Sequence, residues 1–580
     1  MVKKLRDEFL GLDTETIEGF AKLICTSEGK VFKINSLEDI FNFFVSIGVD
    51  RKGVFEKDIY FLAYNADYDI QAIIKYFPVV VINKLVKGIP LKYKGVSFQY
   101  IKDKYFRFGG NYIFDCYQYY QCGLALAAKL YLKEEKGDID RSKITLKNVF
   151  SSGMIRYCIQ DAKLALKLFL YFYNGLPENL KDVKPISSAF YSFMYFRDEL
   201  KANKVSSKVN DVFRQAYSGG RFEVFERGYF KGVYVYDINS AYPFEISKLH
   251  GLKNCSIVRL GEYVKSASYS IYHVKVNINN KFFSPLLYRL KGLCIFPVGD
   301  FKGFVTKGEY ESIVNYKPEI ISAIHVFGDE SFPFRDKIEK LYAWKNKSSN
   351  PLPYKILLNS LYGKTGQKIR KYVRFCAGEP LSIFKDENGV LFFEFEDISG
   401  SNFVYASEIT SKVRLRMYDV LKNNYDKVIA IQTDSLFSKK RLELKLSNKL
   451  GDWKEEFWDE LYILGSGVYF YRKNNEWFGK FRGYNFSGKK TLEILNQVLN
   501  SKKSITEFKT LKHFSILEAN RLHDESLMNL ILEVSRKLDI NFDRKRVWMN
   551  SWHSGKELKE KRIESMAIYL YKNAGQLELY

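Results

Sequence analysis

The sequence has few cysteines, histidines and prolines, and no long hydrophobic run. Its 580 residues include 7 Cys, 6 His and 12 Pro. No two cysteines are spaced as Cys-x-x-Cys and the histidines are scattered, which argues against a zinc site and a disulfide framework. No segment approaches the roughly 20 consecutive apolar residues that a membrane-spanning helix needs. Because residues 1–8 are largely charged, we expect no signal peptide and a soluble protein of a reducing compartment.

Positive charge and aromatic side chains are present in excess. Lys and Arg number 91 against 67 Asp and Glu, a formal charge of +24, and 16% of the residues are aromatic. Clustered Lys and Arg bind phosphates with release of counterions, and exposed rings stack on unpaired bases, although most rings of a large protein lie in its cores. The hydrophobic share of 46% excludes a disordered chain. Composition therefore favours a folded nucleic-acid-binding protein and identifies no reaction.

Hydrophobic patterning divides the chain into several regions, and at ~150 residues per domain we expect roughly four folding units. Apolar runs alternate with helical patterns over 1–175, which predicts an α/β unit, and short strand-like runs fill 251–340. Residues 366–400 predict a hairpin with its turn at 386–389. The last part, 486–580, shows helical spacing with many charges.

Three acidic motifs occur in the first of these regions. Asp13 and Glu15 follow an apolar run and, two apart on a strand, share one face. A second acid follows the apolar run 60–64, and Tyr157 and Asp161 are one helical turn apart. Such a set suits two Mg²⁺ ions ~4 Å apart acting on a phosphodiester. The simpler alternative, that each acid ends a strand or caps a helix, weakens when three motifs occur in this order. The set comprises Asp13, Glu15, Asp69, Asp161 and Tyr157.

A second acidic pair is widely separated in the sequence. The alternating run 232–236 predicts a strand that ends at Asp237, and 427–431 predicts a strand leading into a hairpin with Asp434 at its tip. Carboxylates at strand ends make rigid metal ligands. We therefore expect these two acids to meet around a pair of divalent cations.

A helix predicted between these two acids carries a polar stripe. Lys355, Asn359 and Tyr362 fall at i, i+4 and i+7 and so share one face. A cation, an amide and a phenol in a row could hold a triphosphate and a nucleoside. Taken alone, the pattern equally fits an amphipathic helix with a solvated lysine.

The order of these motifs resembles that of the family B DNA polymerases. Segment 237–243 is similar to the family's motif A, 355–363 matches motif B, and 432–435 resembles motif C. The amino-terminal acids match the three motifs of the proofreading 3′–5′ exonuclease, and 217–220 matches a Tyr-x-Gly-Gly segment that contacts template DNA. Seven motifs in one order over 12–485 form a specific signal.

Within that family the chain resembles the protein-primed branch, the replicases of small linear-genome phages, viruses and linear plasmids. The resemblance implies an α/β and α+β multidomain fold, with an RNase H-like exonuclease and a right-hand polymerase carrying two insertions. It also implies protein-primed initiation, strand displacement and processivity without a clamp. The expected domains are the exonuclease (1–180), the palm (181–250 and 403–485), a terminal-protein-type insertion (251–340), the fingers (341–365), a second insertion (366–402) and the thumb (486–580).

The resemblance also implies roles for single residues. Asp237, Asp434 and the Ile238 carbonyl would bind two Mg²⁺ ions, and the exonuclease acids two more, with Mn²⁺ able to take their place. Lys355 would hold the triphosphate, and Lys136 would assist hydrolysis. The expected catalytic residues are Asp237, Asp434, Lys355, Asp13, Glu15, Asp69, Asp161 and Tyr157. The expected nucleotide-binding residues are Tyr242, which would exclude a 2′-hydroxyl, with Lys345, Lys355, Asn359 and Tyr362. The expected DNA-binding residues are Tyr217, Gly219, Gly220, Asn65, Tyr68, Tyr469 and Lys480.

Three positions depart from the family pattern. Gln432 stands where motif C has its first Asp, which lowers the local negative charge. The primer-binding Lys-x-Tyr segment is present only as 467–469, Gly-Val-Tyr, so its cation would have to come from elsewhere. The exonuclease Ser-Leu segment is replaced by 116–117, Cys-Tyr.

The expected partners are template–primer DNA, deoxynucleoside triphosphates and a terminal priming protein. We expect a monomer with no membrane association in the host cytoplasm, encoded by a virus or plasmid. One alternative is a family B polymerase that extends nucleic-acid primers with a sliding clamp. The other is a non-catalytic nucleic-acid-binding relative, of which Gln432 would be a symptom.

Overall fold

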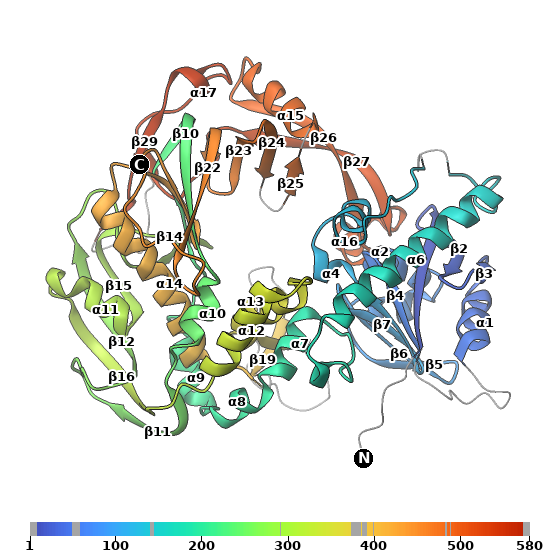
Figure 1. The fold of residues 1–580 in the computed structure, drawn as a ribbon, viewed down its shortest axis with the longest axis horizontal. Coiled ribbons are helices and arrows are strands. Elements are labelled where there is room, and N and C mark those ends of the chain that lie inside the picture. Colours follow the sequence, from blue (N-terminus) through green and yellow to red (C-terminus); the bar gives the residue numbers. More distant parts are fainter. Residues whose placement is uncertain are drawn as a thin grey trace. The chain divides into compact units, whose positions relative to one another are not determined.

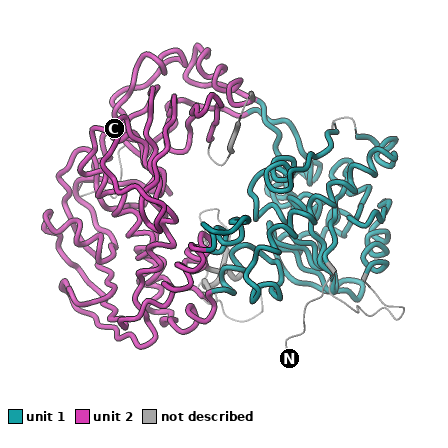
Figure 2. The backbone as a smooth tube through the Cα atoms, in the orientation of Figure 1, with its two compact units in different colours: residues 1–195, 344–357, 509–535 teal, residues 196–343, 358–508, 536–580 magenta. Residues whose placement is uncertain are grey.

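The computed structural model describes two compact units, each formed from separate stretches of the chain (Figure 2). Unit 1 comprises Met1–Tyr195, Trp344–Leu357 and Lys509–Ser535, and unit 2 comprises Phe196–Ala343, Leu358–Phe508 and Arg536–Tyr580. The described residues are 8–48, 59–139, 144–290, 292–372, 384–385, 391–397, 400–481, 484–487 and 489–571. None of the helices they form combines the length and apolar character needed to cross a bilayer.

Unit 1 contains an eight-stranded mixed sheet of order β3-β2-β1-β4-β8-β7-β6-β5. Its strands are β1 (Glu8–Ile17), β2 (Phe20–Thr26), β3 (Val31–Lys33), β4 (Ile59–Ala63), β5 (Leu91–Tyr93), β6 (Val96–Ile101), β7 (Tyr105–Phe108) and β8 (Asn111–Asp115). β4 runs parallel to both β1 and β8, and the other neighbours are antiparallel. Because Gly11 of β1 pairs with Leu62 near the end of β4, Asp13 and the residues after β4 lie at one edge of the sheet.

Helices of unit 1 cover this sheet. They are α1 (Leu37–Gly48), α2 (Ala66–Ile74), α3 (Val79–Leu85), α4 (Tyr117–Tyr120), α5 (Leu124–Ala127), η1 (Ala128–Leu132), α6 (Ser152–Asn174), η3 (Glu178–Leu180) and α7 (Ser188–Tyr195). The longest, α6, begins where the Ser151 side chain accepts a hydrogen bond from the Met154 amide, as N-cap residues do. It packs against β1, β2 and β4 (Figure 1). The predicted α/β character of this region is confirmed.

A segment near the carboxyl terminus belongs to unit 1. Ile516 and Met528 are buried in the same apolar cluster as the amino-terminal strands. The Ile516 amide donates to Gln71 Oε1 at 2.6 Å, and Asn529 Nδ2 donates to the Gly19 carbonyl at 3.0 Å. The region predicted as a thumb, 486–580, is therefore divided between the two units.

The helical spacing predicted for this last region is wrong for most of it. Its elements are α15 (Lys489–Leu499), β26 (Ile505–Phe514), α16 (Ile516–Leu522), η5 (Glu525–Leu527), β27 (Leu530–Asp539), β28 (Val547–Trp548), α17 (Glu557–Glu560), β29 (Ile563–Met566) and β30 (Tyr569–Leu570). β26 and β27 pair with each other. Their burial alternates along much of each strand, which is the pattern of a half-buried ribbon.

Unit 2 is centred on a ten-stranded sheet whose main path is β25-β24-β23-β22-β10-β21-β20-β9. These strands are β9 (Arg221–Val224), β10 (Glu226–Ile238), β20 (Val428–Thr433), β21 (Ser435–Ser438), β22 (Trp453–Gly465), β23 (Val468–Lys473), β24 (Glu476–Phe481) and β25 (Tyr484–Ser487). β29 adds to β10, and β28 adds to β29. Every neighbouring pair on the main path is antiparallel. The predicted strand before Asp237 and the predicted hairpin at Asp434 are confirmed as β10 and β20–β21.

The remaining helices connect and cover this sheet. They are α8 (Arg197–Ala202), α9 (Ser207–Arg214), α10 (Ala241–Ile246), α11 (Lys307–Ile313), η4 (Val314–Tyr316), α12 (Arg335–Lys347), α13 (Leu352–Thr365) and α14 (Phe403–Asn424). The division between the units falls within α12 and α13. α14 contacts α10 and β20, and its Val413, Met417 and Leu421 share an apolar core with Ile238.

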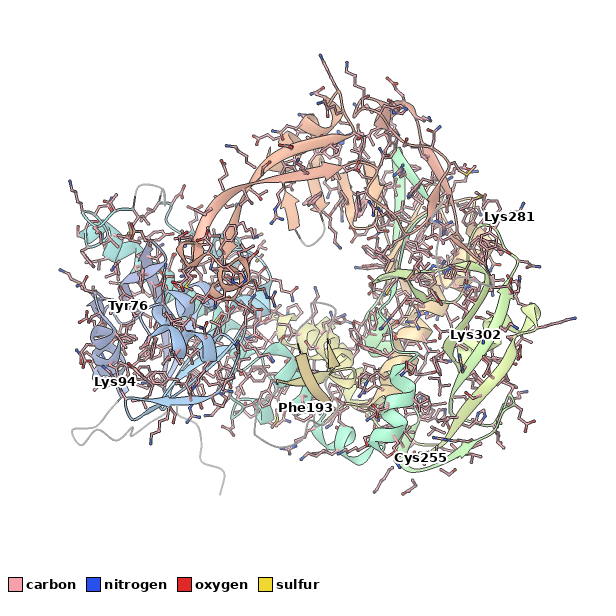
Figure 3. All side chains as sticks on the ribbon, turned by 180° about the vertical axis from the view of Figure 1, so that it is seen from behind. Tyr76, Lys94, Phe193, Cys255, Lys281 and Lys302 are labelled. Atoms are coloured by element: carbon pink, nitrogen blue, oxygen red, sulfur yellow. The ribbon has the colours of Figure 1, made fainter. Side chains whose placement is uncertain are left out.

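The strand-rich pattern predicted over 251–340 is confirmed. β11 (Gly251–Arg259), β12 (Tyr269–Ile278), β15 (Val298–Thr306) and β16 (Glu319–Asp329) form a sheet of order β11-β16-β12-β15-β30, and β13 (Tyr288–Leu290) pairs with β14 (Leu293–Ile295). Lys302 is exposed on β15 (Figure 3). Farther on, β17 (Lys368–Tyr372), β18 (Phe384–Lys385) and β19 (Leu391–Asp397) form a three-stranded sheet. The turn predicted at 386–389 lies outside the described residues.

Candidate active sites

The four acids predicted for an exonuclease lie together at the sheet edge of unit 1. Asp13 and Glu15 are on β1, Asp69 is on α2, and Asp161 is on α6. Desolvation, followed by repulsion from Asp69, Asp161 and Glu15, raises the pKa of Asp13 well above its ordinary value. Repulsion of this kind requires neighbouring carboxylates. The structure therefore brings together four groups that the sequence distributes over three motifs.

Polar neighbours hold these acids in place. Thr14 Oγ1 donates to Asp69 Oδ1 at 2.5 Å. Lys136 forms an ion pair with Asp161, and its Nζ lies 4.8 Å from the ring centroid of Tyr157. Burial lowers the pKa of Lys136, but the charge of Asp161 and their hydrogen bond outweigh it and raise that pKa above its ordinary value. The ammonium therefore stays charged beside the acid.

Cys158 is a neighbour of this cluster that sequence analysis did not single out. Its Sγ lies 3.4 Å from the Asp13 carbonyl, to which it donates. Ligand atoms of Asp13, Glu15 and Cys158 all lie within 4.8 Å of one another. Its spacing in the sequence could have identified it, because a residue three positions before Asp161 on a helix lies on the same face as that acid.

Two of the predicted DNA-binding residues, Asn65 and Tyr68, lie beside Asp69 in the sequence. Asn65 precedes α2 in a left-handed conformation (φ 62°) and is exposed. Tyr68 Oη shares a hydrogen bond of 2.5 Å with Thr16 Oγ1, and its ring meets His513 edge-on, with centroids 5.2 Å apart. In the Cys-Tyr segment that replaces the family's Ser-Leu, Cys116 is fully buried, so its side chain does not reach solvent.

The two acids predicted for a polymerase meet in the central sheet of unit 2. Asp237 at the end of β10 is in register with Ser435 of β21, and the Ile238 amide donates to the Asp434 carbonyl at 3.1 Å. Burial, and then repulsion by Asp237, raise the pKa of Asp434 to about 6. The predicted convergence of these distant residues is confirmed.

A lysine not singled out in the sequence contacts one of these acids. Lys454 Nζ lies 2.8 Å from Asp237 Oδ2, and their side chains are 45% and 35% exposed. Lys454 comes from β22, where it is in register with Asp237. Since both side chains reach solvent, the ion pair does not close the site.

Motif C has two unusual positions before its acid. Gln432 is buried, with 6% of its surface exposed, and neither Oε1 nor Nε2 has a hydrogen-bond partner among the described residues. Thr433 adopts a positive φ of 69°, which turns the chain sharply into Asp434. A neutral amide therefore occupies the position of the family's first motif C carboxylate.

Aromatic rings predicted to contact the nucleotide are stacked. Tyr242 of α10 and Tyr362 of α13 have ring centroids 4.4 Å apart and an interplanar angle of 22°. A Cβ on Gly220 would lie 2.9 Å from Tyr242 Oη and would also overlap the Thr433 side chain. The Tyr-x-Gly-Gly segment, motif A and motif C therefore meet at Gly220, where a side chain has no room.

Two arginines fix this segment from different elements. Arg414 of α14 donates to the Gly219 carbonyl at 2.8 Å and is paired with Glu309. Arg289 of β13 donates to the Tyr217 carbonyl at 2.7 Å. Burial, and then the nearby phenol of Tyr362, raise the pKa of Tyr217 to about 12. Tyr217 therefore stays neutral, and its backbone is held on both sides.

The remaining predicted residues lie on two helices and two strands. Lys355 and Asn359 are exposed on successive turns of α13, which confirms their shared helix, and Lys345 is half-buried on α12. Tyr469 of β23 is in register with Lys480 of β24. Tyr469 is 7% exposed, so its ring contributes more to packing than the sequence indicated.

The donor atoms at both clusters suit magnesium. Asp237 and Asp434 offer carboxylate oxygens, and the Ile238 carbonyl is adjacent; the exonuclease cluster offers four more carboxylates. Mg²⁺ prefers oxygen donors of this kind. Burial, and then repulsion between neighbouring acids, raise the pKa values of Asp13 and Asp434, and a bound cation would offset both effects. The residues present therefore fit divalent cations at both clusters.

Sequence comparisons identify similar proteins. A family model described as DNA polymerase type B, organellar and viral, matches residues 88–450. The DNA polymerase of Acidianus bottle-shaped virus (isolate Italy/Pozzuoli) is 26% identical over 349 residues, which is 55% of this chain and 48% of that protein. The DNA polymerase of Streptococcus phage Cp-1 is 27% identical over 340 residues, 51% of this chain and 57% of that protein. The chain thus spans about half the length of these relatives.

A structural comparison agrees. Phi29 DNA polymerase, solved with primer-template DNA and incoming nucleotide, matches with a TM-score of 0.66 and 17% identity, covering 92% of this chain and all of that one. The expected fold class is confirmed, and so is the resemblance to protein-primed family B polymerases. The domain boundaries and the roles of single site residues stay predictions.

Proposed function

Because the chain belongs to the organellar and viral type B DNA polymerases, we propose that it is a DNA-directed DNA polymerase with 3′–5′ proofreading exonuclease activity. The observation that carries the proposal is the meeting of Asp237 and Asp434 at the ends of β10 and β20, with Tyr242 close by. We further propose that it replicates a linear genome from a protein primer, with strand displacement. It would act as a virus- or plasmid-encoded monomer in the host cytoplasm.

In the polymerase site, Asp237, Asp434 and the Ile238 carbonyl would hold two Mg²⁺ ions. When bound, such ions would activate the attacking 3′-hydroxyl and neutralise the charge of the leaving pyrophosphate. Tyr242, stacked on Tyr362, presents a rigid ring against the sugar of the nucleotide. Lys355 and Asn359, exposed on one face of α13, bind the triphosphate and the nucleoside. Positioning and charge stabilisation of this kind account for most of phosphoryl-transfer catalysis.

In the exonuclease site, Asp13, Glu15, Asp69 and Asp161 would hold the second pair of Mg²⁺ ions. The charged ammonium of Lys136, between Asp161 and the Tyr157 ring, stabilises negative charge on the phosphate that is attacked. Tyr157, whose ring centroid lies 4.8 Å from the Lys136 ammonium, would orient water with its hydroxyl. Tyr68 and Asn65, beside Asp69, hold the unpaired 3′ end.

Two observations support protein priming, fewer than support the polymerase activity itself. Residues 251–340 contribute four strands to a five-stranded sheet that β30 completes, and the fold matches Phi29 DNA polymerase over most of both chains. The proposal predicts that a deoxynucleotide is joined to a hydroxyl of a purified partner protein when no oligonucleotide is present. Extension of DNA primers alone, dependent on a sliding clamp, would instead support a nucleic-acid-primed polymerase.

Separation of the two activities tests the site assignment. Asp434→Asn should abolish primer extension in Mg²⁺ and leave 3′ hydrolysis of single-stranded DNA intact, and Asp13→Asn should do the reverse. Asp419→Asn is the matched control, because Asp419 is an exposed acid paired with Lys422 on α14. Loss of both activities in each variant would contradict the assignment. A wild-type protein that binds DNA but extends no primer would favour the non-catalytic alternative.

A further inference from the structure

The chain lacks a lysine where the family's Lys-x-Tyr segment has one, and the structure explains why none stands there. Gly467 has φ +74°, and a Cβ at this position would lie 3.3 Å from the Phe222 ring. A left-handed residue against an aromatic ring disfavours any side chain. The cation of this segment therefore has to come from another strand.

Lys454 occupies a suitable position on the neighbouring strand β22. It is in register with Asp237, and its ammonium lies 2.8 Å from that carboxylate. Lys480 of β24 lies in register with Tyr469, the tyrosine of the same segment. A cation from β22 thus faces one of the acids at which a primer 3′ end would react, and a second cation from β24 lies beside Tyr469.

The existing ion pair leaves Lys454 available to a ligand. Its side chain is 45% exposed on a flexible four-carbon stem. The other nearby acid on β22, Glu456, is already paired with Lys473 at 2.9 Å. A divalent cation on Asp237 would compete with this ion pair, and the exposed ammonium of Lys454 would then be available to a phosphate of the bound strand.

We propose that Lys454 binds the 3′-terminal phosphodiester of the primer strand and, with Lys480, supplies the cation that Gly467 cannot. This inference rests on the proposed polymerase function. Lys454 is a positioning residue here, since it holds the primer end against the acids. The competing explanation is that Lys454 only neutralises Asp237 in the metal-free protein.

The test is the affinity for primer–template DNA, measured by fluorescence anisotropy over a range of salt concentrations, with and without Mg²⁺. Lys454→Met keeps the apolar stem, and we expect it to weaken binding about tenfold and to reduce the slope of log K against log salt by about 1. Lys454→Arg should restore most of the affinity. Lys473→Met, which breaks an equivalent ion pair on the same sheet, should bind DNA as the wild type does.

Primer extension separates failure of this inference from failure of the proposed function. If the wild type extends primers and Lys454→Met binds DNA with unchanged affinity and salt slope, the inference is overturned. If the wild type extends no primer, the polymerase proposal itself fails. Thermal unfolding of Lys454→Met should match that of the wild type, because a half-exposed ion pair contributes little to stability.

Discussion

Glu223 is the centre of a buried charge network behind motif C. Its Oε2 pairs with Arg221 at 2.6 Å and its Oε1 with Arg546 at 2.9 Å, and all three side chains are at most 1% exposed. Arg546 also donates to the Phe282 carbonyl at 2.5 Å. Arg221 and Glu223 lie on β9, in register with Thr433 and Ile431. The network therefore joins the carboxyl-terminal stretch to the strand that precedes Asp434.

Glu223→Gln removes this central negative charge with almost no change of shape. Two buried guanidinium groups would then share no counter-ion, and breaking one buried pair costs about 3–5 kcal/mol. We therefore expect the free energy of unfolding of unit 2 to fall by about 5 kcal/mol, a large part of the roughly 5–15 kcal/mol that folded domains have. Primer extension should be lost at a lower temperature than in the wild type.

Urea unfolding followed by tryptophan fluorescence measures this change. Five of the 6 tryptophans lie in unit 2, so the signal reports mainly on that unit. Glu319→Gln is the control, because it breaks an exposed pair with Lys275 in the same unit and should cost less than about 1 kcal/mol. If the unfolding midpoint of Glu223→Gln equals that of the control within error, then leaving the two guanidinium groups without a counter-ion does not lower the free energy of unfolding, and the reasoning is refuted.

Three further predictions follow from single contacts. Burial raises the pKa of Asp115 to about 6, above ~3.9 for the unfolded chain, so its ionisation destabilises unit 1 by up to about 3 kcal/mol as pH rises from about 4 to 6. Asp115→Asn should remove this part of the pH dependence of urea unfolding; an unchanged pH profile would contradict it. Met528→Asp, in the unit 1 core, should cost about 3 kcal/mol and inactivate the exonuclease on mild heating, whereas Met549→Asp, 62% exposed, should not. Gly220→Ala should reduce primer extension at least tenfold through overlap with Tyr242 and Thr433, while Gly261→Ala, outside the site and with nothing within 4 Å of its Cβ, should have little effect. Equal primer extension by the two glycine variants would contradict this steric explanation.

Local sequence patterns were sufficient for much of the site. Alternation with a period of two located β10, an apolar run located the strand before Asp434, and the spacing of Tyr157 and Asp161 located them on one helix, α6. These predictions succeed because side-chain direction along a strand or helix depends on a few neighbouring residues. The motif resemblance then supplied the expectation that the acids of separate motifs converge.

Patterns failed where packing overrides local preference. The carboxyl-terminal stretch carries charges at helical spacing, yet its described residues form strands β26 to β30 as well as short helices. Ile516 and Met528 are ordinary apolar residues whose spacing does not say which core they enter. They enter the core of unit 1, in the segment between the paired strands β26 and β27.

Residue types and their spacing along the chain were enough to identify the family, the acids and the helices that bear them. Strand register had to be known before Lys454 could be assigned a role, and the surroundings of Gly467 before its lack of a side chain was explained. The physical reason is that register between strands distant in the chain depends on the whole sheet, and no local pattern carries it. Asp237 lies opposite Lys454 because β10 pairs with β22 along almost its whole length.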